Sequence, residues 1–292
     1  MFPKRIILSR KGFDGTAGGC PSPIFQDGTM FSIPIPENGK HKVRTRYEDL
    51  GQQGGYQFPK KLVTSSGRGI PLSGQVHLDP DIRPSLRPSF AAADCSSTLL
   101  YGQDGSSQTH LENEGVGEDD LFLFFGLFRR ATCKDDSAYF ERSSRQAHVI
   151  WGWLQVSNRF RLQRGQLPES LKSATHHPHL DYRDRDINCM YVGSPSLSFC
   201  DNVAGAGIFD RYDDALRLTS LDEYRCSHWT LPSFFAKAGM TYHSLQAWDR
   251  RGELIRGQAV GRGQEFVMKT DSVEQEARVW LNSLFRHAKR VD

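Results

Sequence analysis

The sequence lacks the cysteine spacing of a zinc site or a disulfide framework. Its six cysteines include no Cys-x-x-Cys pair and follow no regular interval, whereas structural zinc sites and small disulfide scaffolds depend on such spacing. We therefore expect free thiols and no structural zinc. The cysteines are Cys20, Cys95, Cys133, Cys189, Cys200 and Cys226.

Long apolar runs are also missing. A run such as Leu121–Phe125 is far shorter than the roughly 20 residues of a membrane-spanning helix. The N-terminal run Ile6–Leu8 is too short for the core of a signal peptide. We therefore expect a cytoplasmic protein that has no membrane partner.

Two familiar catalytic signatures are absent as well. Gly18 and Gly19 are followed by Pro21-Ser22-Pro23, and not by the Gly-Lys-Ser/Thr ending of a P-loop or the helix of a Rossmann fingerprint. The chain also has no Gly-x-Ser-x-Gly elbow, which local sequence would need to indicate a hydrolase of that type. Neither internal repeats nor low-complexity tracts are present.

The composition is that of a globular protein with many loops. The chain has 292 residues, 38% hydrophobic content and 27 glycines, which is enough to bury a sizeable core. We expect one domain over residues 1–292. The net charge of +3 is modest for a nucleic-acid coat protein, but arginines are bunched at 159–164 and 250–262. Each bunch also has a simpler interpretation as solvated surface.

Strand patterns predict an α+β fold built on a curved mixed or antiparallel sheet. Lys4–Arg10 has the form of a first strand. Leu121–Arg129 and His148–Val156 are nearly continuous apolar runs and should be antiparallel neighbours. Asn188–Ser194 adds a strand, and the prolines of Phe31–Pro36 predict an edge strand or an extended segment.

Helices and loops complete this prediction. Val273–Ala288 carries apolar residues at helical spacing, and Ser272 with Gln275 suggests a capping box. We expect this amphipathic helix to close the sheet. Trp229–Ala238 should be a short helix that stops at Gly239. The segment 51–90 is rich in Gly, Pro and Ser, and a loop of this length is usually functional or mobile.

Three polar runs between glycines mark the candidate site: Lys11 to Asp14, Gln103 to Asn113, and Arg262 to Glu265. They offer acids, bases and carboxamides, which proton transfer and base recognition require. We predict that they line one concave site, although a surface ion pair and a self-bonded polar loop are simpler alternatives. The catalytic candidates are Lys11, Asp14, His110 and Glu265. The substrate-binding candidates are Gly18, Gly19, Gln103, Gln108, Asn113, His177, His179, Trp229, Arg262 and Gln264.

The segment His177–Asp181 contains the His-x-Asp spacing found in iron-dependent oxygenases. Such a site needs a second, distant histidine, and the strand context does not nominate one. We favour a hydrogen-bonded pair formed by His177 and His179. Trp229 is the best aromatic candidate for the groove, with core packing as its alternative.

Eight motifs together resemble the third nucleotide-modification-associated domain family over nearly the whole chain. Members of that family are associated with systems that modify bases in DNA, so the resemblance implies a nucleotide or nucleic-acid context, with DNA favoured over RNA. The motifs are Ile7–Asp14, Gly19–Ile24, Leu78–Asp81, Gln108–Leu111 with Asn113, Leu121–Arg129, Gly152–Val156, His177–His179 and Gly263–Val267.

Three hypotheses about function follow. The first is an enzyme of unknown reaction that acts on a nucleotide or on a base in nucleic acid. The second is a non-catalytic reader, because the strand pair around 120–128 and 150–156 resembles part of the base-binding barrels of the PUA and EVE kind. The third is a metal-dependent oxygenase that uses His177, His179 or Asp181. The cofactor is left open.

Overall fold

The architecture is α+β, as the sequence predicts. The computed structural model describes residues 2–37, 43–92, 98–134, 137–163, 167–172, 174, 176–181, 187–241, 249–251, 254–258 and 265–288. None of the helices in these ranges is long and apolar enough to cross a membrane.

One large mixed sheet organises the described residues. Its hydrogen-bonded path runs through β14 (Glu265–Lys269), β1 (Arg5–Arg10), β6 (Leu121–Lys134), β8 (Ala147–Arg161), β9 (Asn188–Gly193) and β5 (Leu100–Asp104). Strands β2 (Ser22–Ile24) and β7 (Ser137–Phe140) pair with β6, and β10 (Ala206–Ile208) pairs with β8. Along the path only β1 and β6 are parallel. The path ends at β14 and β5 and does not close into a barrel.

The centre of the sheet is the antiparallel pair β6 and β8, which the apolar runs predict. Their pairing shifts register between Phe124 and Phe125, opposite Gly152 and Ile150. Such an irregularity bends a strand and increases its twist. Gly152 also permits close approach, since a Cβ there would lie 3.0 Å from the carbonyl oxygen of Gly207 on β10.

Short elements surround this sheet. The α-helices are α1 (Lys60–Thr64), α2 (Ser89–Ala92), α3 (Gly105–Asn113), α4 (Phe234–Ala238) and α5 (Glu274–Leu284). The 3-10 helices are η1 (Tyr47–Asp49), η2 (Pro84–Leu86), η3 (Glu169–Leu171), η4 (Pro178–Asp181), η5 (Asp214–Leu216) and η6 (Phe285–His287). A second sheet has the order β11 (His228–Pro232), β13 (Leu254–Gln258), β12 (Asp249–Arg251), and a third pairs β3 (Gln52–Gln53) with β4 (Tyr56–Gln57).

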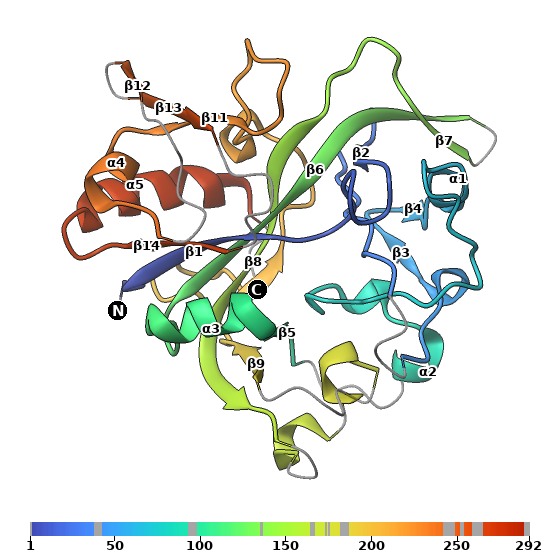
Figure 1. Cartoon of the computed structure of the whole chain (residues 1–292), viewed down its shortest axis with the longest axis horizontal. Helices are drawn as coiled ribbons and strands as arrows, with labels where there is room; N and C mark the ends of the chain where they lie inside the picture. The colour runs from blue at the N-terminus through green and yellow to red at the C-terminus, as the bar shows by residue number, and fades with distance from the viewer. Residues whose placement is uncertain are drawn as a thin grey trace.

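Figure 1 shows how these elements are distributed around the long β6. Helices α4 and α5 lie on one side of it with β11, β12 and β13, and α1, α2, β3 and β4 lie on the other. Two separate apolar clusters correspond to this division. The larger one joins the main sheet to α4 and α5, and the smaller one packs the segments between Phe13 and Leu86 together.

The C-terminal helix is confirmed, but its predicted capping box is wrong. Helix α5 begins after Val273, whose side chain cannot cap it, and no side-chain cap bond is formed. The helix is secured instead by its apolar face, on which Ala277, Trp280 and Leu281 are buried. Tertiary burial, not capping, therefore holds this helix in place.

The predicted helix over Trp229–Ala238 is correct only in its second half. Its first half is strand β11, and α4 then ends at Gly239, whose φ of 73° suits glycine. The segment 103–113, for which a self-bonded polar loop was the simpler alternative, is the end of strand β5 followed by helix α3. Phe31–Pro36 forms no strand, and Pro36 makes an isolated bridge with Val76.

Trp229 lies in the core and not in a groove. Its ring is fully buried, packs edge-on against Phe125 and approaches Phe266. Its indole nitrogen donates a hydrogen bond of 2.9 Å to Nδ1 of His148, which is also buried. Burial, helped by the nearby charge of Arg10, lowers the pKa of His148 to about 3. The pair is thus a polar contact inside the apolar core, and His148 stays neutral.

This contact predicts a stability change in acid. The unfolded chain protonates His148 near pH 6.5, whereas the folded chain does so near pH 3. Between these values the unfolded state binds more protons, so stability falls as the pH falls, by at most about 1.4 kcal/mol per pH unit from this one group. The variant His148→Asn keeps an acceptor for Trp229 but cannot titrate. Urea unfolding at pH 5 and pH 7 should show a smaller difference in the free energy of unfolding for the variant than for wild type. Equal differences would contradict a neutral, buried His148.

Candidate active site

The site begins with Glu265, the first residue of β14 and a fully buried carboxylate. Its backbone partner on β1 is Ser9. Glu265 lies at one end of the sheet path, while the strand that carries Tyr101 and Gln103 is β5 at the other end. These strands share no backbone ladder, so side chains join the two ends of the curved sheet.

Three donors converge on one oxygen of Glu265. Its Oε1 accepts hydrogen bonds from the Ser9 hydroxyl at 3.0 Å, the Tyr101 hydroxyl at 2.9 Å and the Gln103 amide nitrogen at 2.5 Å. The ammonium of Lys11 lies 3.7 Å from the same oxygen. A carboxylate with this many donors is oriented strongly. The side chain is therefore held in one position before any ligand arrives.

Burial determines the electrostatics of the Lys11–Glu265 pair. Loss of water raises the pKa of Glu265, while the charge of Lys11 and the three hydrogen bonds oppose that rise. The net direction is upward, toward the range in which a carboxyl group exchanges protons at neutral pH. Lys11 keeps 12% of its side chain exposed, whereas Glu265 keeps none. Solvent therefore reaches this cluster from the side of Lys11.

An aromatic wall supports the carboxylate. Tyr101 packs against Phe122, Phe124 and Tyr191, with ring centroids 4.9 to 5.6 Å apart. Lys11 places its ammonium 4.6 Å from the Tyr101 ring centroid, a cation–π contact. Burial and the nearby Glu265 raise the pKa of Tyr101 well above its usual value, so its hydroxyl remains a donor.

Gln108 belongs to this wall and not to an exposed loop. It is fully buried on α3, and its carbonyl oxygen accepts a hydrogen bond of 3.1 Å from Tyr191. Its amide nitrogen donates to Glu112 at 3.3 Å. Gln108 therefore reaches Glu265 only indirectly, by fixing Tyr191 behind Tyr101.

A second set of ionisable groups lies on the other face of β5. Gly102, between Tyr101 and Gln103, donates its backbone N–H to Oδ1 of Asp79 at 2.7 Å. Nε2 of His177 lies 3.3 Å from the same oxygen, and Nε2 of His179 lies 3.9 Å from Oδ2. Burial would raise the pKa of Asp79, but His177, His179 and Lys11 outweigh it and hold that pKa below its usual value.

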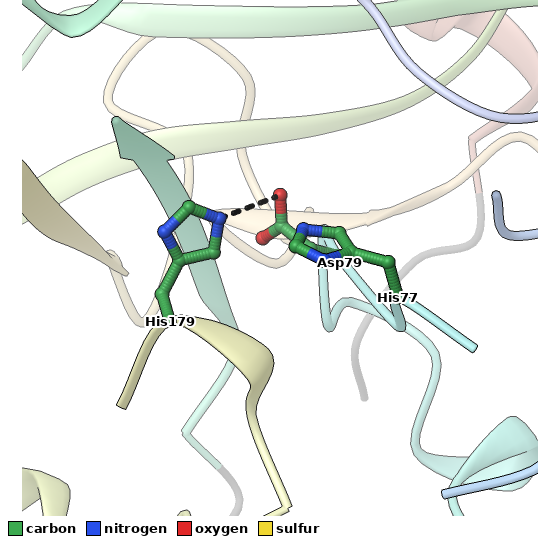
Figure 2. Close-up of side chains that lie close together, drawn as sticks. All are labelled: His77, Asp79 and His179. Carbon is green, nitrogen blue, oxygen red and sulfur yellow. Dashed lines mark ion pairs between the residues drawn. The ribbon is translucent and has the colours of Figure 1, made fainter. Parts of the chain in front are cut away.

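Two polar partners fix the histidines around Asp79. Nδ1 of His179 lies 2.9 Å from the side-chain oxygen Oδ1 of Asn188. Nδ1 of His77 lies 2.9 Å from a carboxylate oxygen of Glu37. His77, Asp79 and His179 each offer one ligand atom, and these atoms all lie within 4.8 Å of one another. Figure 2 shows the imidazoles of His77 and His179 on either side of the Asp79 carboxylate. Among the described residues, these three are the His, Cys, Asp or Glu side chains that lie close enough together to hold one metal ion.

The structure brings three of the predicted site residues together, and the prediction that the three polar runs line one concave site stays a prediction. Lys11, Gln103 and Glu265, from three distant segments, come together as described above. His177 and His179 enter the adjoining set around Asp79, where His179 bonds with Asn188 and not with His177 alone. Their predicted roles in catalysis and binding stay predictions.

The remaining residues of the N-terminal loop have structural roles. Asp14 accepts hydrogen bonds from the backbone N–H groups of Thr16 and Ala17 and pairs with Arg10 at 2.7 Å, which closes the turn. Lys11 and Asp14 thus pair with different partners. Gly18 has a φ of +114°, and a Cβ there would lie 2.4 Å from the Phe13 ring. Gly19 has a φ of +85° and packs against Arg68.

Six further candidates lie elsewhere or outside the described residues. His110 projects from α3, with Nε2 3.3 Å from the hydroxyl of Thr241. Asn113 is exposed at the last position of α3. Arg262 and Gln264 lie outside the described residues, as does the side chain of Asp181. Trp229 is in the core.

Several residues of the site escaped the sequence prediction. Ser9 and Tyr101 lie on strands, where alternation does not distinguish a ligand from a core residue. Glu37, His77 and Asp79 come from loops that fold against each other. The last two belong to His77-Leu78-Asp79, which has the same His-x-Asp spacing as His179-Leu180-Asp181 and lies inside the long loop expected to be functional.

The family of the chain follows from comparison with known proteins. A family model described as nucleotide modification associated domain 3 matches residues 5–269. The chain belongs to this family. The match includes all the residues of the two sets around Glu265 and Asp79. No curated protein and no solved structure matched the chain in the corresponding searches.

The Lys11–Glu265 pair predicts a stability coupling. The variant Lys11→Met leaves a buried carboxylate without its cation and should cost about 3 kcal/mol of unfolding free energy at neutral pH. The double variant Lys11→Met/Glu265→Gln removes both charges, so it should recover at least about 1 kcal/mol of that loss. Urea unfolding of the wild type, both single variants and the double variant measures the coupling. Strictly additive losses would show that the two groups do not interact.

Proposed function

We propose that this protein is an enzyme that acts on a nucleotide or on a base in nucleic acid. Membership of the nucleotide modification associated domain 3 family supplies the substrate context. The observation that carries the proposal of catalysis is the meeting of Lys11, Glu265, Tyr101 and Gln103 from opposite ends of the sheet. DNA is the favoured polymer, as the resemblance implied.

The chemistry of the set suits proton transfer. Glu265 combines complete burial with a raised pKa and a nearby ammonium group, the combination that marks candidate acid–base residues. In the proposed reaction Glu265 exchanges a proton with the base or with the attacking group. Lys11, at the more exposed side of the set, holds a phosphate or a developing negative charge.

The non-catalytic reader is less well supported. A reader needs stacking surfaces and a basic rim, but Trp229, its aromatic candidate, is a core residue. It has no need of a buried lysine–carboxylate pair, which is costly to desolvate.

The test is a search for altered nucleosides. DNA, RNA and nucleotide pools incubated with the protein, and nucleic acids from cells that express it, are digested and analysed by mass spectrometry. We expect wild type to change the mass of one nucleoside. Glu265→Gln should slow this change by about 100-fold or more, the usual contribution of a general acid or base.

The matched control is Glu276→Gln, which alters an exposed glutamate that pairs with Lys237 on the surface. It should retain the wild-type rate. Binding of nucleic acid without any mass change, unaffected by Glu265→Gln, would replace the enzyme with a reader. No binding and no mass change with any substrate class would remove the nucleotide assignment.

A further inference from the structure

The group around Asp79 has the composition of a transition-metal site. Two imidazoles and one carboxylate, His77, His179 and Asp79, offer ligand atoms within 4.8 Å of one another. This donor set, with coordination positions left open, is typical of non-haem Fe(II) centres and of related catalytic sites for divalent metals. The spacing is also that of such a site, because His77 and Asp79 are two residues apart and His179 is distant in sequence.

The imidazole of His179 is held in the tautomer that a metal requires. Asn188 donates its amide nitrogen to the carbonyl oxygen of His179 at 2.9 Å, which fixes the orientation of its carboxamide. The carbonyl oxygen of that carboxamide then faces Nδ1 at 2.9 Å. Nδ1 of His179 therefore carries the proton, and the lone pair of the neutral ring is on Nε2, the nitrogen turned toward Asp79.

The imidazole of His77 is held in the same way by a carboxylate. Glu37 can only accept when ionised, so Nδ1 of His77 is the donor across their 2.9 Å contact. The backbone keeps the two residues opposed, because the Glu37 N–H binds the carbonyl of Gln75 and the His77 N–H binds that of Ile35. A carboxylate on the second nitrogen of a histidine is the usual arrangement around metal-bound imidazoles.

The carboxylate of Asp79 is oriented by a group other than the two proposed ligand histidines. The N–H of Gly102 donates to Oδ1 at 2.7 Å. Nε2 of His177 lies 3.3 Å from the same oxygen without making a hydrogen bond, and Nδ1 of His177 accepts the backbone N–H of His179. The other oxygen, Oδ2, faces Nε2 of His179 at 3.9 Å. That separation is too long for a hydrogen bond but short enough for two ligands of one ion.

The ring of His179 packs directly against the backbone of Gly102 on β5. A Cβ on Gly102 would lie 2.3 Å from Cγ of the His179 ring, so glycine is required for the ring to lie over β5. Neighbouring ligand atoms about 2.1 Å from one ion lie about 3 to 3.4 Å apart, so the three side chains must move closer together by about 1 to 2 Å to bind one.

From this geometry we propose that His77, Asp79 and His179 bind one divalent transition-metal ion, of which Fe²⁺ is the best match to the donor set. Glu37 and Asn188 orient the imidazoles, and the backbone N–H of Gly102 orients the carboxylate. The site does not rest on the proposed function, because metal binding is measured without a substrate.

The experiment is an anaerobic titration with Fe²⁺, Co²⁺ and Zn²⁺, read by calorimetry, by the visible spectrum of Co²⁺ and by the rise in melting temperature. We expect one ion per chain. His77→Gln and Asp79→Asn should weaken binding by about 100-fold or more. Glu37→Gln should weaken it by about 10- to 100-fold, the usual effect of losing an orienting partner. Gly102→Ala should weaken it as well, although it alters no ligand.

The matched control is His228→Gln. His228 has the same contact with a carboxylate, Nδ1 to Glu223 at 3.0 Å, but lies outside this group, so its variant should bind metal as wild type does. His77 is 14% exposed, which favours folding of His77→Gln if Asp79→Asn unfolds. The proposal is overturned if folded wild type binds no ion, or if folded His77→Gln binds with unchanged affinity and an unchanged Co²⁺ spectrum.

Discussion

The hydrogen bonds to the buried carboxylate of Glu265 are the interaction that links the two ends of the sheet path. Strands β14 and β5 are the two ends of the hydrogen-bonded path, and an open sheet has no backbone ladder with which to hold its ends together. Tyr101 and Gln103 of β5 close that gap by donating to Glu265. Apolar side chains in place of Tyr101, Gln103 and Glu265 could still pack in the core. They would not fix how β5 is oriented relative to β14, because only hydrogen bonds are directional. The hydrogen bonds that join the two ends of the path therefore also set the position of the candidate site.

Strand β5 contacts a different set of ionisable groups on each of its two sides, because successive residues of a strand face opposite sides. Tyr101 and Gln103 face Glu265, whereas Gly102 between them faces His179 and binds Asp79 through its backbone. The two ionisable sets are thus separated by a single strand. Lys11 acts on both, through a direct contact with Glu265 and through its charge on Asp79. A change at Lys11 consequently alters the electrostatics of both sets.

The main elements of the fold could be predicted because they follow from local pattern. The apolar runs of β6 and β8, the strand β1 and the helix α5 each bury a periodic face, and periodicity is visible in sequence. The failures have tertiary causes. The sequence around Trp229 does not show that Phe125 and His148 surround its ring in the fold. The helix α3 was not predicted because two of its three buried residues, Ser107 and Gln108, are polar and only Leu111 is apolar. Composition cannot distinguish a polar helix that is buried from a polar loop.

The site was predicted only in part for a related reason. Lys11, Gln103 and Glu265 were found because they are polar side chains next to glycines. His177 and His179 were also candidates, but Glu37, His77 and Asp79 were not, because their contacts depend on which loops face each other. The same His-x-Asp spacing occurs at His77 and at His179, and sequence alone gave no reason to prefer the first. What decides between them is the backbone pairing that sets Glu37 against His77 and the absence of a side chain at Gly102, which lets His179 approach. Both are properties of the folded chain, so the distant histidine that such a site needs can be named only once the long loop is seen against β5.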